Sequence, residues 1–117
     1  MKKGAEATQS GKIPDALETY TKVINLDPNY AEGWNQRALT HYLMGNYESS
    51  LSDIRRTLSL EPRHFGAISG QGLIYLAQHK WALAKKAFNR ALKIHPTMRG
   101  PRQNLLFLEK RDLEEEI

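Results

Sequence analysis

The sequence predicts an all-α protein built from stacked, antiparallel helix pairs, with a capping helix at its C-terminal end. Two observations lead to this fold class. Small, large and proline residues recur at a fixed step of 34 residues, and each 34-residue unit contains two helical runs separated by a break. A period of this length is typical of helical repeat proteins, in which each unit buries its apolar face against its neighbours.

Three prolines, Pro28, Pro62 and Pro96, mark the ends of successive units. Between them, small residues recur in two columns and large apolar residues in two others. The small columns are Gly4/Ala38/Gly72 and Ala16/Ser50/Ala84, and the large ones are Tyr20/Ile54/Phe88 and Ile13/Tyr47/Trp81. We expect the small columns to let paired helices approach closely, while the large columns fill the space around them.

Breakers and caps divide each unit into its two helices. In the middle unit the first helical run ends at Gly45-Asn46, a breaker followed by a potential helix cap. The second run stops before Pro62, because the residue that precedes a proline is disfavoured in a helix. Pro14 lies at a helix start, where a missing N–H costs nothing. The predicted helices span residues 2–10, 14–26, 30–44, 47–60, 64–78, 81–94 and 99–114.

These residues resemble the tetratricopeptide repeat (TPR) family, whose pattern runs from an aromatic residue through Leu-Gly, Tyr, Ala, a large apolar residue and Ala to Pro. The sequence departs from it at Arg37 and Gln71, in the usual leucine column, and at His41, in the usual tyrosine column. The resemblance covers about residues 1–98 and implies a right-handed α-solenoid. The matching residues are Trp34, Ala38, Ser50, Ile54 and Pro62 in the middle unit, Gly72, Tyr75, Ala84, Phe88, Ala91 and Pro96 in the third, and Gly4, Ala16, Tyr20 and Pro28 in the first.

We expect one array over residues 1–117, with repeats at about 1–30, 31–64 and 65–98 and a capping helix at about 99–117. In the family's phase the first repeat lacks the opening of its first helix, so we expect the native chain to continue upstream of Met1. The uncovered end, around Ala7, Ile13 and Leu17, would then favour self-association. The capping helix carries an apolar stripe of Leu105, Leu106, Leu108 and Leu113 opposite a charged face.

Composition excludes several classes of function. The 117 residues are 40% hydrophobic with a net charge of +4, and they contain no cysteine, which rules out disulfides and a cysteine nucleophile. No apolar run approaches the ~20 residues of a membrane helix, and no signal-peptide core follows the basic start. We therefore expect a cytoplasmic location for the chain as written, and no membrane partner.

The sequence shows none of the catalytic or metal-binding motifs that carry chemistry at a fixed spacing. His41 is expected to be a packed, hydrogen-bonded core residue, and His64, His79 and His95 fall at or near turns. Asp53 lies near Arg56, which we interpret as surface pairing rather than as an acid–base dyad. We therefore expect no enzyme, no cofactor, no metal and no small-molecule substrate.

The resemblance implies a concave groove lined by the first helix of each repeat, apolar at its centre and with amides at its rim. Such a groove suits an amphipathic helix or an extended apolar peptide of a partner protein, and so predicts a protein–protein interaction scaffold. Some family members clamp a C-terminal carboxylate with Lys, Asn and Arg; the matching positions here hold no such basic set. The expected groove residues are Asn35, Gln36, Leu39, Tyr42, Leu43, Gly66, Ser69, Gly70, Leu73, Leu76, Gln103, Asn104 and Phe107.

Three alternatives stay open. Leu39, Leu73 and Leu76 would pack against neighbouring helices instead of a ligand, and Gly66 and Gly70 would mark only a soft helix start. Nucleic acid is a disfavoured second function, because base-stacking aromatics do not interleave with the bases of the second helices. The chain would otherwise be a regulatory fragment of a larger protein. The bases are Lys22, Arg55, Arg56, Lys85, Lys86, Arg90 and Lys93.

Overall fold

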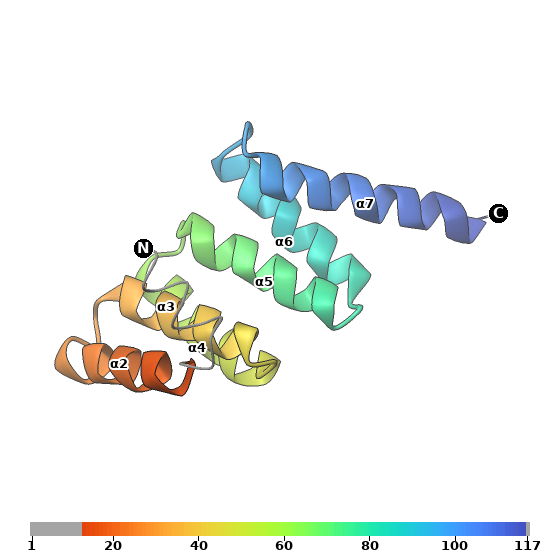
Figure 1. Cartoon of the computed structure of the whole chain (residues 1–117). Helices are drawn as coiled ribbons and strands as arrows, with labels where there is room; N and C mark the ends of the chain where they lie inside the picture. Colours follow the sequence, from red (N-terminus) through yellow and green to blue (C-terminus); the bar gives the residue numbers. More distant parts are fainter. Residues whose placement is uncertain (1–12, 117) are drawn as a thin grey trace. The chain divides into compact units, whose positions relative to one another are not determined.

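The structure is a computed structural model that describes residues 13–116. Within these residues the chain forms six helices and no strand, joined by short turns (Figure 1). The helix predicted over residues 2–10 lies outside the described range. The helices are α2 (Ile13–Leu26), α3 (Ala31–Leu43), α4 (Tyr47–Leu60), α5 (Phe65–Ala77), α6 (Trp81–Ile94) and α7 (Arg99–Glu116).

The helix boundaries agree with the sequence-based expectation to within one residue, except at the end of α7, which continues to Glu116. The agreement has a local cause. Helix α4 ends at Leu60 because Glu61, which precedes Pro62, adopts an extended conformation with φ −135°. The predicted all-α architecture of helix pairs is therefore confirmed.

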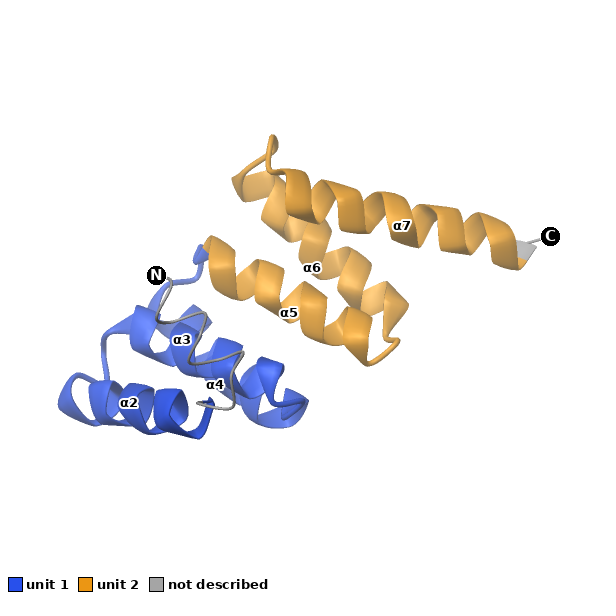
Figure 2. Cartoon of the chain, in the orientation of Figure 1, with its two compact units in different colours: residues 1–64 blue, residues 65–117 orange. Residues whose placement is uncertain are grey.

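The chain divides into two compact units, residues 1–64 and residues 65–117, each of which is described here by itself (Figure 2). In the first unit α3 packs against both α2 and α4. In the second unit α6 packs against both α5 and α7. Each unit therefore contains one complete helix pair, α3–α4 or α5–α6, with a further helix packed against it.

The core of the first unit shows why its small columns are small. Ala38 on α3 and Ser50 on α4 are 2% and 1% exposed, and the Ser50 hydroxyl donates a hydrogen bond of 2.6 Å to the Ala38 carbonyl. This contact ties the two helices together at their closest approach. Ile24, Leu51 and Ile54 are buried around it, so the large residue of the middle unit fills the predicted position.

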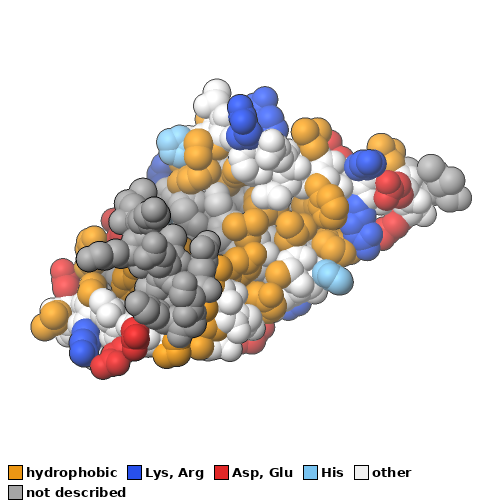
Figure 3. Space-filling model, in the orientation of Figure 1, with side chains coloured by type: hydrophobic (Ala, Val, Ile, Leu, Met, Phe, Trp, Pro, Cys, Tyr) orange, Lys and Arg blue, Asp and Glu red, His pale blue; other side chains and the backbone are white. Residues whose placement is uncertain are grey.

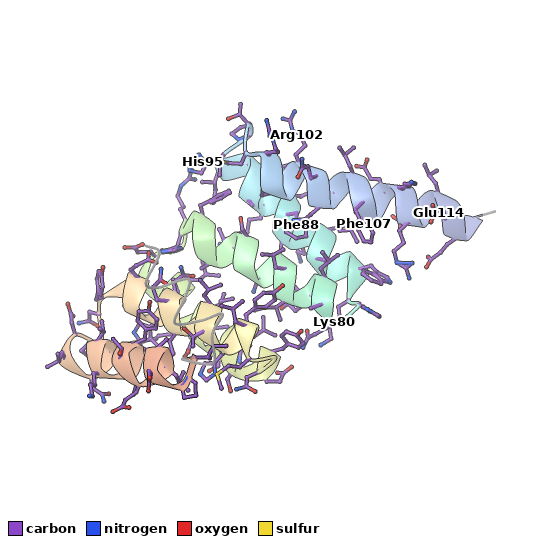
Figure 4. The ribbon with its side chains drawn as sticks, viewed as in Figure 1. Lys80, Phe88, His95, Arg102, Phe107 and Glu114 are labelled. Carbon is purple, nitrogen blue, oxygen red and sulfur yellow. The ribbon has the colours of Figure 1, made fainter. Side chains whose placement is uncertain are left out.

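The second unit is organised around Phe88, which is fully buried on α6 (Figure 4). Its ring occupies the space beside the backbone of Gly72 on α5. Ala84 from α6 and Leu105 and Leu108 from α7 complete the cluster. Helix α7 thus closes the apolar end of the α5–α6 pair, as expected for a capping helix. Tyr75, Leu76, Trp81 and Leu92 pack against the same cluster, partly buried.

Two turns at equivalent positions use the left-handed backbone conformation. Gly45 has φ +79°, and His79, which stands 34 residues later, has φ +59°. Glycine adopts this conformation at no steric cost, whereas a residue with a Cβ is strained there. The His79 ring stacks on Trp81 with a centroid distance of 4.9 Å, so ring stacking offsets part of the backbone strain. Asn46 occupies the predicted cap of α4, but its side chain makes no capping hydrogen bond.

The predicted apolar stripe of α7 is only half correct. Leu105 and Leu108 are buried, whereas Leu106 and Leu113 are 59% and 63% exposed. The physical reason is the helical period: residues three apart share a face, while Leu106 and Leu113 project from a different side of the helix. Leu106 and Leu113 therefore belong to the surface of α7 and not to its packing face.

Candidate binding surface

The expected groove residues lie on three helices of the structure. Since the two units are described separately, the groove as a joint surface stays a prediction, and each helix face is considered alone. Asn35, Gln36, Leu39, Tyr42 and Leu43 lie on α3 in the first unit; Gly66, Ser69, Gly70, Leu73 and Leu76 lie on α5, and Gln103, Asn104 and Phe107 on α7, in the second.

One face of α3 carries an exposed apolar stripe. Leu39 and Leu43 are 49% and 47% exposed, although they are large hydrophobic residues in the middle of a well-packed unit. They follow Glu32 by seven and eleven residues, a spacing that places all three side chains on one side of the helix. Tyr42 is half-buried, with its ring 5.9 Å from that of Tyr47. Leu39 and Leu43, more than Tyr42, are thus available to a partner.

The Glu32 carboxylate collects three hydrogen bonds at the N-terminal end of this face. Its Oε1 atom accepts from the side-chain amides of Asn35 and Gln36, at 3.1 and 2.9 Å. Its Oε2 atom lies 2.9 Å from Nε2 of His64. Burial raises the pKa of Glu32, but the hydrogen bonds from the three side chains outweigh it, and the pKa lies below its usual range. Glu32 is therefore held as an anion.

This network changes the role expected of the two amides. Asn35 and Gln36 each use a side-chain donor on Glu32, so they orient the carboxylate as well as facing a ligand. Sequence reasoning missed Glu32. The spacing of three and four residues to the amides was a usable signal, because side chains at these spacings are neighbours on a helix. His64 lies 32 residues away, and no local pattern pointed to it.

A buried ion pair lies on another side of α3. Arg37 donates from Nε and a terminal nitrogen to both oxygens of Asp53 on α4, at 2.8 and 2.9 Å. Asp53 is 4% exposed, so the expected surface pairing with Arg56 is wrong. The cause is the departure at the leucine column: a guanidinium in a core position needs a carboxylate within reach. The pair raises the pKa of Arg37 above its usual range, because Asp53 hydrogen-bonds to the charged form.

His41 is packed beside this ion pair, as expected, but without the expected hydrogen bonds. Its Nε2 atom lies 3.9 Å from Asp53, which is beyond hydrogen-bonding distance. Its Nδ1 atom is buried and has no hydrogen-bond partner in the described part of the chain. Arg37 and Asp53 satisfy each other with two bonds, which leaves the carboxylate turned toward the guanidinium and away from the imidazole.

The ion pair borders a shallow pocket that recurs in the second unit. The first pocket has a volume of about 400 Å³ and includes His41 and Ser52 in its lining. The second, of about 220 Å³, includes Tyr75 and Lys86, which stand 34 residues further on. A hollow that returns at the repeat period, with different side chains each time, is a feature of helix packing. We do not assign it a ligand.

The faces of α5 and α7 also expose apolar side chains. Leu73 is 37% and Phe107 53% exposed, and hydrophobic side chains gather over α5 and the neighbouring part of α7 (Figures 3 and 4). Leu76 instead packs on the Phe88 cluster, which confirms the packing alternative for this residue. Gly66 is exposed, Gly70 is half-buried, and the buried Ser69 hydroxyl has no hydrogen-bond partner among the described residues.

Several bases of the second helices are engaged within the chain. Lys22 pairs with Glu18 at 3.3 Å, and Lys85 pairs with Asp112 on α7. The Arg56 guanidinium lies 5.6 Å from the centre of the Trp34 ring. These contacts give the basic residues structural partners, and nothing in the described helices interleaves them with aromatic rings in the manner of a single-strand binding surface.

The described residues contain no group of three or more His, Asp or Glu side chains that could hold a metal ion. Among the described helices, none combines the length and the apolar character that a bilayer crossing requires. The histidines outside the α3–α4 pair make structural contacts: His64 with Glu32, His79 with Trp81, and His95 edge-on to Phe65 at 4.9 Å.

Comparison with known proteins identifies the repeats. A TPR repeat model matches residues 4–45 and a tetratricopeptide repeat model matches residues 31–64, together more than half of the chain. A TPR repeat-containing protein of Rhizobium etli is 40% identical over 106 residues, which cover 91% of this chain and 52% of that protein. The chain belongs to the tetratricopeptide repeat family. It spans about half the length of the Rhizobium etli relative.

Two solved structures have the same fold. The first TPR of Spaghetti (RPAP3), bound to the HSP90 peptide SRMEEVD, has a TM-score of 0.84 at 24% identity, covering 94% of this chain and 87% of that chain. The second TPR domain of human RPAP3, in complex with the HSP70 peptide SGPTIEEVD, has a TM-score of 0.79 at 23% identity, covering 92% and 90%. At this identity the likeness shows the fold, and the ligands named are those of the two RPAP3 domains.

Proposed function

We propose that this chain is a non-catalytic protein–protein interaction scaffold that binds a peptide or helical segment of a partner protein on the first helices of its repeats. The observation that carries the proposal is the pair of half-exposed leucines on α3, Leu39 and Leu43. Exposed apolar side chains in a row mark interaction surfaces when the rest of the domain buries its core. The amides beside them supply hydrogen bonds that fix the register of an incoming chain.

The repeat organisation supports this proposal. We place repeats at about residues 1–30, 31–64 and 65–98 and the capping helix at about 99–117, and one family model coincides with the second repeat. The RPAP3 domains, which share the fold, hold short peptides. Binding energy at such surfaces concentrates in a few desolvated apolar contacts, and α3, α5 and α7 each offer one or two such residues.

The mode of binding we propose differs from a carboxylate clamp. The expected groove residues on α3, α5 and α7 include no lysine or arginine, so a terminal carboxylate would find no cationic partner among them. Gly66 and Gly70 leave the face of α5 without large side chains at two positions. The ligand is therefore an internal segment of its protein, held by apolar contacts and amide hydrogen bonds.

The absence of catalysis is part of the proposal. The carboxylates and imidazoles of the described surface serve structural contacts: Asp53 is paired with Arg37, and Glu32 accepts three hydrogen bonds. A general acid or base must instead reach a substrate proton. The scaffold would act by holding its partner, either alone or as part of a longer chain.

A peptide selection tests the proposal. A library of random 12-residue peptides displayed on phage is selected on the immobilised 117-residue chain, and the enriched peptides are synthesised. Binding is then measured by fluorescence anisotropy. We expect the variant Leu39→Asp/Leu43→Asp to bind at least tenfold more weakly, because a charge in each apolar contact must be desolvated. Leu26→Asp, at an 86% exposed leucine on α2, is the matched control and should bind like the parent chain.

The proposal fails if no peptide is enriched over the bare support. It also fails if the enriched peptides bind Leu39→Asp/Leu43→Asp as tightly as the parent chain, provided that both variants show the same helical circular dichroism spectrum.

A further inference from the structure

We infer that the binding face of α3 selects peptides with a basic residue beside their apolar anchor, and that Glu32 is the residue that makes this selection. The inference rests on the proposed function and adds the charge of the ligand to it. It follows from the contacts of Glu32, the other charges of α3 and the position of Glu32 relative to Leu39 and Leu43.

The partners of Glu32 hold its carboxylate without supplying a fixed positive charge. Asn35 and Gln36 are neutral, and His64 is charged only when it is protonated. No lysine or arginine nitrogen of the described residues lies within 4.0 Å of the carboxylate. A carboxylate offers about four acceptor positions, of which these donors occupy three. The remaining position is on Oε2, and the side chain is 41% exposed.

The rest of α3 does not cancel this negative charge. The guanidinium of Arg37 is bound to Asp53, with both carboxylate oxygens engaged. The N-terminal end of a helix carries a partial charge of roughly +0.5, and Glu32 lies in the first turn of α3. A full negative charge on Glu32 therefore exceeds the helix-end charge, and the exposed face keeps a net negative pole although the whole chain has a net charge of +4.

The apolar pole lies at a fixed distance from this carboxylate. At 1.5 Å per residue, Leu39 is about 10 Å and Leu43 about 16 Å along the helix axis from Glu32. An extended peptide covers about 10 Å with three residues, whereas a helical peptide needs seven. A lysine or arginine three residues from an apolar anchor, or seven in a helical ligand, reaches Glu32 while the anchor covers Leu39.

This arrangement also predicts which ligands are rejected. An acidic peptide would bring a carboxylate toward Glu32 with no lysine or arginine among the expected groove residues to offset it. Juxtaposed like charges oppose association and suppress the wrong partner. The acidic peptides that the two RPAP3 domains hold are thus the opposite of what this face accepts.

The experiment repeats the peptide selection on the parent chain and on Glu32→Lys in parallel. We expect lysine and arginine to be enriched over aspartate and glutamate in peptides from the parent chain, and the reverse in peptides from Glu32→Lys. An exposed ion pair contributes up to about 1 kcal/mol, which is about fivefold in affinity. A peptide selected by the parent chain should therefore lose about three- to fivefold in affinity for Glu32→Gln and about tenfold for Glu32→Lys.

The control is Glu18→Lys, which makes the same change in net charge at an exposed residue of α2. It should bind the selected peptide within twofold of the parent chain. If Glu18→Lys weakens binding as much as Glu32→Lys, the effect belongs to net charge and the inference is wrong. It is also wrong if both selections return the same balance of charges. Failure of the proposed function is a different result, in which no peptide is enriched or the Leu39→Asp/Leu43→Asp variant still binds.

Discussion

Gly72 on α5 lies so close to the ring of Phe88 on α6 that a Cβ atom at position 72 would come within 2.6 Å of Cε1. Phe88 is fully buried and cannot move without disturbing Ala84 and Leu108. The small residue at this position therefore sets the distance between the two helices, as the 34-residue pattern predicted.

Gly72→Ala should lower the free energy of unfolding by about 1–3 kcal/mol, because the added methyl group overpacks the core. Alanine is the better helix former, so a loss of stability would show that packing dominates over helix propensity. The measurement is a urea unfolding curve followed by circular dichroism. Gly100→Ala on α7 is the matched control: a Cβ there meets nothing within 4 Å, and the midpoint should stay the same or rise.

The Arg37–Asp53 pair should behave as a coupled unit. Asp53→Ala leaves a largely buried guanidinium without its partner, and Arg37→Gln leaves a buried carboxylate unpaired. Each single change should cost about 3–5 kcal/mol. The double variant introduces Gln and Ala, the residues found 34 positions later at Gln71 and Ala87, and should cost less than either single change. Additive losses in a double-mutant cycle would show that the pair is not coupled.

His79 should reveal the strain of its turn. The left-handed conformation costs roughly 1–2 kcal/mol for a residue with a Cβ, while the stack on Trp81 contributes about 0.5–1.5 kcal/mol. His79→Ala keeps the strain and loses the stack, whereas His79→Gly loses both. We therefore expect His79→Gly to be more stable than His79→Ala by about 1 kcal/mol in thermal unfolding. Gly45→Ala should lose a similar amount, since its Cβ would meet nothing but the backbone strain remains.

Stability should depend on pH through Glu32. Its pKa is lowered in the folded state, so Glu32 stabilises the fold at pH values above its unfolded pKa of about 4.3, and this contribution is lost as the pH falls through the lower folded-state value. The urea midpoint of the parent chain should exceed that of Glu32→Gln at pH 7, and the difference should shrink below about pH 4. Removing two donors with Asn35→Ala/Gln36→Ala should reduce this pH dependence; an unchanged profile would contradict the role of the amides.

Much of the fold could be predicted because the signals that define it are local and repeated. Proline and glycine end the helices wherever they occur, and the small and large columns repeat with each unit, so every boundary is supported by its equivalent 34 residues away. The outward side of α7 lacked this support, since α7 has no equivalent helix in the array. Leu106 and Leu113 were for this reason assigned to the wrong face.

The candidate site could be predicted only in part, because its polar contacts join distant positions. Leu39 and Leu43 followed from the family phase, and their exposure agrees with it. Asp53 and its partner Arg37 lie 16 residues apart on different helices, and neither fits the family pattern. The departure at Arg37 was visible in the sequence, but its meaning required the geometry: an arginine in a core column implies an acid on the facing helix.

The Arg37–Asp53 pair has a consequence for how such arrays can be recombined. Both partners belong to the second repeat, one on each helix, so a transfer of the whole α3–α4 hairpin carries the charge balance with it. A crossover in the Gly45-Asn46 turn would separate them, joining Arg37 to Ala87 in one product and Gln71 to Asp53 in the other. Chimeras of this chain should therefore be cut between hairpins, after Pro28 or Pro62, where no core charge is divided between two parents.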